Sequence, residues 1–381
     1  MSTCRVLITG ASGFTGRHLA ARLAQTTSAR VIGLDQAPPL PPGEGWGEGS
    51  QAKTQTSRVG PACVSERRPT NSVENRWAGG RLGGLVPPYD SRDGQSLVLP
   101  PHPDPLPEGE GDADFLPCDL TDPEAVRQAV ERADPDLVFH LAGIFGSDSP
   151  EEIRRVNVGG FVHLRDALRR QAGRRGRPIR MLVVGSAAEL GITGATRLPV
   201  AENACCQPET AYGRSKWEAT RLALAEPTDG PLAIVVARPF NLVGPGLSPR
   251  LALGNFARQI ADVVRGRADA IRCGPLDTRR DYLDVRDAVE AYRLLVERGR
   301  PGQLYHVCAG RSYRIGDLLQ RMLALAGASA AILSQPTDRA GDLADIYGDP
   351  GKIAAECGWT AKIDIDRSLA DLLAWAIARR R

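Results

Sequence analysis

Two side chains suited to acid–base chemistry lie one helical turn apart in the segment 209–224, whose pattern predicts a helix. They are Tyr212 and Lys216, in the order YxxxK, and this spacing places both on one face of a helix. A phenol titrates near pH ~10, and a neighbouring ammonium is expected to lower the pKa of the phenol toward neutrality. The pair therefore predicts a proton donor, although a YxxxK pair alone also occurs on ordinary exposed helices.

A hydroxyl group strengthens this interpretation. Ser186 ends the apolar run 180–186, which predicts a buried strand. A hydroxyl at a strand end can hydrogen-bond the carbonyl oxygen of a substrate and hold it for protonation. Ser186, Tyr212 and Lys216 together predict reduction or oxidation at a carbonyl carbon, which requires a hydride donor.

The hydride donor has a predicted site near the start of the chain. Residues 5–23 read RVLITGASGFTGRHLAARL, a short apolar strand followed by glycines and a helical pattern. The glycines are Gly10, Gly13 and Gly16. We expect Gly10 to form the tight turn, Gly13 to let the backbone approach a pyrophosphate, and Gly16 to let the helix pack on the strand. The N-terminus of that helix favours phosphate, so we predict a dinucleotide site, although the spacing is TGxxGxxG rather than GxGxxG.

The second predicted strand, 30–35, ends in a carboxylate. Asp35 follows the glycines at the distance expected for a group that accepts a hydrogen bond from the adenosine ribose 2′-hydroxyl. The same charge repels a 2′-phosphate, so the sequence favours NAD(H), with NADP(H) as the alternative. The other interpretation of Asp35 is a solvated loop carboxylate.

Residues 37–112 interrupt the domain with a segment rich in Gly, Pro, Ser and Arg. The segment shows no apolar periodicity, and its two ends, PLPPGEGWGEG from Pro39 and PLPEGEG from Pro105, are similar. A structureless loop of this length is unusual inside a compact domain. We predict a disordered insertion without a catalytic role, the alternative being a partner-binding loop.

Strand and helix patterns alternate along the remainder of the first part of the chain. This alternation predicts an α/β fold with a Rossmann-type doubly wound parallel sheet. After residue 240 the alternation loosens, so we predict a dinucleotide-binding domain at 1–240 and a smaller C-terminal α/β substrate lobe at 241–381, with some segments returning to the first domain. The expected strands are 114–120, 137–141, 180–186, 232–237, 281–283 and 303–307, and the expected helices are 151–168, 209–224, 251–264, 285–296, 315–325 and 367–378.

Composition excludes several other classes of protein. The formal net charge is only +3, and no basic run indicates a nucleic-acid partner. No apolar stretch is long enough to span a membrane, and the chain enters a core strand at once, so we expect no signal peptide. The eight cysteines are scattered without metal-ligand spacing. We expect a cytoplasmic protein without a metal site.

The motifs together resemble the extended short-chain dehydrogenase/reductase family, the NAD-dependent epimerase/dehydratase group that acts on nucleotide sugars. The resemblance runs through TGASGFTG, CDLTD, HLAG, SAAELG, YGRSK and ARPFNLVGPG. Within the family, the chain looks most like GDP-4-keto-6-deoxy-mannose reductases, which make GDP-rhamnose. Three segments carry this closer resemblance: ARPFNLVGPG, RRDYLDVRD and LYHVCAGRSYRI. One departure is Leu190, where relatives commonly have Tyr.

The resemblance implies roles for individual residues. Ser186, Tyr212 and Lys216 would be catalytic, and Ser186, Asn241, Arg280 and Arg339 would bind substrate, the two arginines at its diphosphate. Resemblance also suggests a homodimer formed through the helices that bear Asn157 and Tyr212. The expected cofactor contacts are Gly10, Gly13, Phe14, Thr15, Gly16, Asp35, Asp119, Leu120, Leu141, Ala142, Gly143, Tyr212, Lys216 and Pro239.

The turn after Ser186 narrows the expected reaction. Dehydratases of this group have acidic residues directly after the hydroxyl, and fucose-synthase relatives have an epimerising Cys, whereas this chain has Ala187 and Ala188. The first hypothesis is NAD(P)H-dependent reduction of a 4-keto-6-deoxy nucleotide sugar. The alternatives are a nucleotide-sugar 4-epimerase and a non-catalytic NAD(P)-sensing protein.

Overall fold

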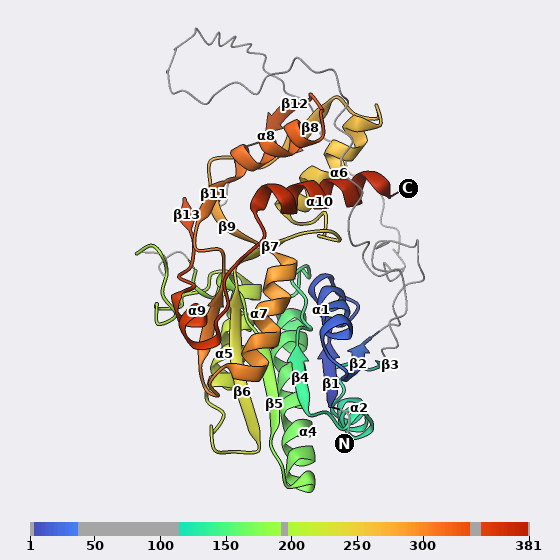
Figure 1. Ribbon diagram of the computed structural model, residues 1–381, viewed down its shortest axis with the longest axis vertical. Helices are drawn as coiled ribbons and strands as arrows, with labels where there is room; N and C mark the ends of the chain where they lie inside the picture. The colour runs from blue at the N-terminus through green and yellow to red at the C-terminus, as the bar shows by residue number, and fades with distance from the viewer. Residues whose placement is uncertain (1–3, 37–113, 192–196, 336–343, 380–381) are drawn as a thin grey trace, which may run out of the picture. The chain divides into compact units, whose positions relative to one another are not determined.

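Seven parallel strands form the main sheet of the computed structural model (Figure 1). Their spatial order is β10-β6-β5-β4-β1-β2-β3. β2 and β3 are added on one side of β1 and the later strands on its other side, so the strand order reverses between β1 and β4. In open sheets of this kind, ligands bind at the carboxyl ends of the strands beside such a reversal. The strands are β1 (Arg5–Thr9), β2 (Arg30–Asp35), β3 (Asp114–Pro117), β4 (Leu137–His140), β5 (Ile179–Val184), β6 (Leu232–Pro239) and β10 (Leu304–Val307).

Helices cover both faces of this sheet, which is why its strands are apolar throughout rather than alternating. One face packs against α2 (Pro123–Ala133), α4 (Gly160–Arg175) and α5 (Ala211–Leu224). The other face packs against α1 (Phe14–Thr26), α7 (Val285–Arg298) and α9 (Gly351–Cys357). The predicted doubly wound Rossmann-type fold is confirmed.

The structure describes residues 4–36, 114–191, 197–335 and 344–379, which all belong to one compact unit. The predicted insertion at 37–112 and the substrate candidate Arg339 lie outside the described residues. The strands that flank the insertion are described: β2 and β3 pair in parallel, with Ile32 opposite Asp114 and Asp35 opposite Pro117. The chain on either side of the insertion therefore completes the edge of the main sheet.

This pairing leads to a first prediction. Replacing residues 40–110 by a short Gly/Ser linker should preserve the fold and NADH binding, because β2 and β3 are already neighbours and the entropy of a loop changes only logarithmically with its length. Circular dichroism and a fluorescence titration with NADH would measure both properties. Loss of NADH binding in a folded deletion variant would show instead that the insertion contributes to the site.

A second layer of elements lies at one end of the main sheet (Figure 1). Its apolar core is formed by α6 (Ala252–Val264), α8 (Ile315–Leu325) and α10 (Ile365–Ala378). Its short strands are β7 (Asn241–Val243), β8 (Ala270–Cys273), β9 (Arg279–Asp284), β11 (Ser312–Arg314), β12 (Ala331–Ser334) and β13 (Asp345–Ile346). β10 lies later in the chain than β7 to β9 yet pairs with β6, so this segment returns to the main sheet. The exact domain boundaries at 240 and 241 stay a prediction.

The single helix expected at 151–168 is interrupted in the structure. It is divided into α3 (Pro150–Arg154), a π-helical turn (Arg155–Gly159) and α4. Asn157 lies in that turn and hydrogen-bonds outside its own helix, to the loop after β4 and to α5. A single-turn π-helix often marks a functional region, because it redirects one side chain without ending the helix.

The strand expected at 114–120 is also shorter than predicted. β3 ends at Pro117, which has no N–H to donate to a neighbouring strand. The chain then turns: the carboxylate of Asp119 accepts from the backbone N–H of Thr121, and Asp122 caps α2. The short elements β7, β8, β11, β12, β13 and α9 were not predicted at all.

Candidate functional site

The glycine loop forms the centre of the candidate site, between β1 and α1. Gly10 adopts a φ of +71°, and a Cβ there would lie 2.9 Å from the Ala142 backbone. A Cβ on Gly16 would lie only 2.1 Å from the carbonyl oxygen of Gly10. A larger residue at Gly16 would push α1 away from the turn, and one at Gly10 would collide with the backbone that follows β4. The loop and the N-terminus of α1, with Gly13 as its cap and Phe14 and Thr15 in its first turn, therefore have the geometry of a phosphate site.

The ends of β1 and β4 meet beneath this loop. The backbone N–H of Leu141 donates to the carbonyl of Thr9 at 3.2 Å, and that of Ala142 donates to the Thr9 hydroxyl at 3.3 Å. The same hydroxyl contacts Nδ1 of His140 at 2.8 Å. Burial lowers the pKa of His140 to about 3. His140 is thus a neutral, buried histidine that joins two strands.

Asp35 lies against the glycine loop. Its Oδ2 accepts from the backbone N–H of Ser12 at 3.2 Å and from the Ser12 hydroxyl, and its Oδ1 accepts from the N–H of Gln36. The Gln36 side chain in turn donates to Asp119 at 3.0 Å. The carboxylates of Asp35 and Asp119 are therefore joined in one network at the ends of β2 and β3. Leu120 follows in the chain and is buried.

The structure brings Ser186 and Tyr212 together. Ser186 follows β5 and caps a short 3₁₀ turn, and its side chain lies close enough to Tyr212 to lower the pKa of the phenol. Tyr212 is in the first turn of α5, and Lys216 lies one turn further along this helix. Lys216 is 8% exposed, and its Nζ lies 3.7 Å from where a Cβ on Gly143 would stand. Ser186 thus lies near Tyr212, and Lys216 of the same helix reaches the Ala142–Gly143 segment.

The ionisation of Tyr212 differs from the sequence prediction. Burial raises the pKa of Tyr212, the hydrogen bond from Ser186 lowers it, and the charge of Glu189 raises it. The sequence predicted that Lys216 would lower the pKa, but the net shift is upward, because burial disfavours the phenolate. Burial also lowers the pKa of Lys216, to about 8. At neutral pH Tyr212 is therefore the protonated partner, suited to donating a proton.

Two positions near this centre were missed by sequence reasoning. Asn157, on the π-helical turn, binds both the N–H and the carbonyl of Ile144 and donates to the Ser215 hydroxyl. Phe145, which follows Ile144 in the chain, is 47% exposed. Its ring lies edge-on to that of Tyr212, with ring centroids 6.4 Å apart. Asn157 thus fixes a loop that presents an apolar ring beside the proton donor.

Two of the expected substrate residues, Asn241 and Arg280, lie on short strands that follow β6 in the chain. Pro239 ends β6, and Asn241 begins β7, where its side chain donates to the carbonyl of Asp281 at 3.0 Å. Arg280 is on β9, which pairs with β7, so Asn241 and Arg280 occupy neighbouring strands. One guanidinium nitrogen of Arg280 donates to the carbonyl of Arg279.

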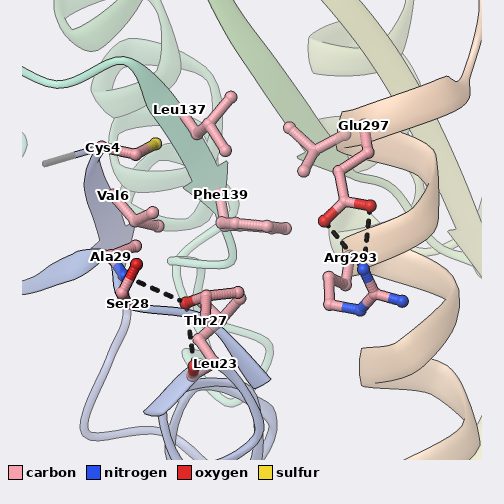
Figure 2. Close-up of a pocket in the computed structure, with 11 residues that line it drawn as sticks. Cys4, Val6, Leu23, Thr27, Ser28, Ala29, Leu137, Phe139, Arg293 and Glu297 are labelled. Carbon is pink, nitrogen blue, oxygen red and sulfur yellow. Dashed lines mark hydrogen bonds and ion pairs between the residues drawn. The ribbon is translucent and has the colours of Figure 1, made fainter. Parts of the chain in front are cut away.

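A pocket elsewhere in the protein is not part of this site (Figure 2). It lies at the amino ends of β1 and β4, whereas the glycine loop follows the carboxyl end of β1. Its lining is mostly apolar, with an Arg293–Glu297 ion pair along α7 on one side. Within the ranges that the structure covers, no cluster of His, Cys, Asp and Glu has the composition of a metal site, and no helix is long and apolar enough to cross a membrane.

Known proteins are similar to this chain in sequence and fold. A family model described as GDP-mannose 4,6 dehydratase matches residues 101–372, and one described as NAD dependent epimerase/dehydratase family matches residues 6–44. The GDP-6-deoxy-D-mannose reductase of Pseudomonas aeruginosa is 31% identical over 247 residues, 63% of this chain and 79% of the relative.

Solved structures show the same fold. The structure of RMD from Pseudomonas aeruginosa complexed with NADPH matches with a TM-score of 0.69 at 24% identity, covering 99% of this chain and 100% of that one. The Thermus thermophilus UDP-glucose 4-epimerase in complex with NAD matches with a TM-score of 0.69 at 20% identity, covering 98% and 99%. From the extent of the family match and the identity to the reductase, the chain belongs to the GDP-mannose 4,6 dehydratase family of NAD-dependent epimerases and dehydratases.

Proposed function

We propose that this protein reduces the 4-keto group of a 6-deoxy nucleotide sugar, of the GDP-4-keto-6-deoxy-mannose type, with NAD(P)H. The observation that supports this most is the close approach of Ser186 and Tyr212 at the carboxyl end of the sheet, with the buried Lys216 one turn further along the same helix as Tyr212. The choice of GDP-linked substrate rests on the similarity to the Pseudomonas aeruginosa reductase.

The cofactor residues fit a dinucleotide. The pyrophosphate would lie on the Gly10–Gly16 loop, the adenosine ribose on Asp35, the adenine near Asp119 and Leu120, and the nicotinamide ribose on Tyr212 and Lys216. A bound dihydronicotinamide supplies a hydride to a carbonyl carbon. We propose that Asn241 and Arg280 hold the sugar and the diphosphate.

The chain's own residues would handle the proton. The Ser186 hydroxyl holds the substrate oxygen, and the protonated Tyr212 donates its proton to that oxygen as the new alcohol forms. Lys216, protonated at neutral pH, balances the charge left on Tyr212. Ala187 and Ala188 offer neither the acid of a dehydratase nor the thiol of an epimerising enzyme, although the family is named for a dehydratase.

Incubation with GDP-4-keto-6-deoxy-mannose and NADH or NADPH would test this proposal. We expect loss of nicotinamide absorbance and an equal amount of a GDP-6-deoxyhexose. Interconversion of UDP-sugars without net use of cofactor would instead identify a 4-epimerase, which is an alternative because the same Ser–Tyr pair can serve both reactions. Cofactor binding without turnover of GDP-, UDP- or dTDP-sugars would indicate a sensing protein.

We also propose a cytoplasmic homodimer. In this structure the helix bearing Tyr212 packs against α3, and Arg154 forms an ion pair with Glu218 between the two. The seven cysteines within the described ranges are all free, as expected in a reducing compartment. Analytical ultracentrifugation would establish the oligomeric state.

A further inference from the structure

A buried carboxylate lies directly behind Ser186 and is not assigned a role by the proposed mechanism. Glu189 is 0% exposed and ends the 3₁₀ turn that Ser186 begins. Its Oε1 accepts from the backbone N–H of Ser186 at 2.8 Å, while the Ser186 hydroxyl accepts from the N–H of Ala188. Ser186 and Glu189 thus form a reciprocal cap that fixes where the serine stands.

The same carboxylate binds two further elements. Oε1 accepts from the hydroxyl of Thr220 on α5 at 2.9 Å. Thr220 is one helical turn beyond Lys216, so this bond acts on the helix that bears both proposed proton-transfer residues. Glu189 therefore ties the turn bearing Ser186 to the helix bearing Tyr212.

The third partner is Arg238, at the end of β6. Its Nε and Nη2 donate to Glu189 Oε2 at 3.0 and 2.8 Å, and Arg238 is itself only 1% exposed. β6 continues directly into Pro239 and Asn241, the residues proposed for cofactor and substrate. A buried pair of this kind is a poor source of net stability, since desolvation offsets the attraction. The Glu189–Arg238 pair is better explained by the groups that it holds in place, which are Ser186 and the helix α5.

We propose that Glu189 is a positioning residue for the proposed reduction: its carboxylate aligns Ser186 with Tyr212 by joining the turn after β5 to α5 and β6. Its buried charge also opposes ionisation of Tyr212. The kinetic test of this inference rests on the proposed function, because it needs turnover of the proposed substrate. The three partners of this carboxylate come from the turn after β5, from α5 and from β6, so a single side chain joins all three.

The electrostatic half of the proposal depends on the groups that surround the site. The charge of Glu189 raises the pKa of Tyr212 and of Lys216. The other titratable or charged groups that face Glu189, Tyr212 or Lys216 are Arg238 on β6, Cys206 beside Arg238, His140 on β4 and Tyr292 on α7. His140 is neutral, and burial raises the pKa values of Cys206 and Tyr292, so Arg238 is the cation that opposes Glu189.

Glu189→Gln keeps the shape of the side chain and removes its charge. We expect kcat to fall by about tenfold or more with little change in KM or in the Kd for NADH, because misplacement of a reacting group affects turnover rather than binding. Reduction needs protonated Tyr212, so rate falls as pH rises through its pKa. Without Glu189 that pKa is lower, and the alkaline limb of the kcat profile should move to lower pH.

Thr220→Val is the matched control. It removes one hydrogen bond to Glu189 and leaves the charge in place, so kcat should fall less and the alkaline limb should stay where it is in the wild type. Because Glu189→Gln leaves Arg238 without a counter-charge, Glu189→Gln combined with Arg238→Met provides a second variant without a buried unpaired cation. The double variant should show the same shift of the limb.

Tyrosine difference absorbance against the matching Tyr212→Phe variants measures the same ionisation without any substrate. A lower midpoint in both Glu189 variants supports the inference even if wild-type protein turns over no 4-keto sugar, which would overturn only the proposed function. An unchanged midpoint and an unchanged alkaline limb in a folded Glu189 variant would overturn the inference. A loss of kcat in which Glu189→Gln and Thr220→Val behave alike, without a pH shift, would also overturn it.

Discussion

Replacing Tyr212 by Phe is expected to lower kcat with the proposed 4-keto substrate by about 10²-fold or more, the usual effect of losing a positioned proton donor. The substitution removes the hydroxyl that lies near Ser186 and keeps the ring that packs beside Phe145. The Kd for NADH should change little, because most of the proposed cofactor contacts come from β1, β2 and β4. Steady-state kinetics together with a fluorescence titration would measure both quantities.

Tyr305→Phe is a suitable control for this experiment. Tyr305 is a buried tyrosine on β10 whose hydroxyl accepts from the N–H of Arg300 and donates to Glu356, away from the glycine loop. The control variant loses a bonded hydroxyl of the same kind and should keep wild-type turnover. Near-normal turnover in Tyr212→Phe would remove Tyr212 from the mechanism.

The parts of this structure that the sequence predicted well are those encoded locally. Strand β2 and helix α8 occupy the predicted residues, because apolar runs and helical periodicity are properties of neighbouring residues. The glycine loop was predicted because the positive φ of Gly10 and the close approach of Gly16 to the Gly10 carbonyl are properties of a single turn. The short strands β8 and β12 pair only with each other and are too brief to show a period.

The parts that were missed depend on contacts between distant segments. Glu189 appears in the sequence as one acidic residue after two alanines, and nothing local connects it to Arg238 or Thr220. The π-helical turn follows from the bonds that Asn157 makes to Ile144 and Ser215. The upward shift in the pKa of Tyr212 follows from burial, which the tertiary fold determines. Spacing predicted which groups meet, but not the electrostatic environment in which they meet.

The cofactor preference gives a second prediction with a large expected effect. We expect this protein to bind NADH about tenfold or more tightly than NADPH, because Asp35 should bond a free 2′-hydroxyl and repel a 2′-phosphate. One lost charge-assisted hydrogen bond costs about 1.5–3 kcal/mol, which corresponds to a factor of about ten or more. Ser12 and Gln36 hold the carboxylate at the glycine loop, so its position is set before cofactor arrives.

Arg17 is the residue that would oppose this preference, since a guanidinium near the ribose would attract a 2′-phosphate. In the structure Arg17 is half-buried, and burial and the neighbouring Arg379 lower its pKa. Arg379 follows α10, so Arg17 is close to the C-terminal helix. Its location therefore favours Asp35 as the group that decides between the two cofactors.

Asp35→Ser should narrow or reverse the preference for NADH, and Kd values for both cofactors measured by fluorescence titration would show this. Asp114→Ser is the control: it removes a carboxylate from the neighbouring strand at its amino end, where Asp114 pairs with Arg30, and should leave the ratio unchanged. The RMD of Pseudomonas aeruginosa was solved with NADPH, so the expected result separates this chain from that protein. Wild-type affinity for NADPH equal to or greater than that for NADH would mean that Asp35 does not contact the ribose, because a carboxylate bonded to the 2′-hydroxyl has no means of accepting a phosphate in its place.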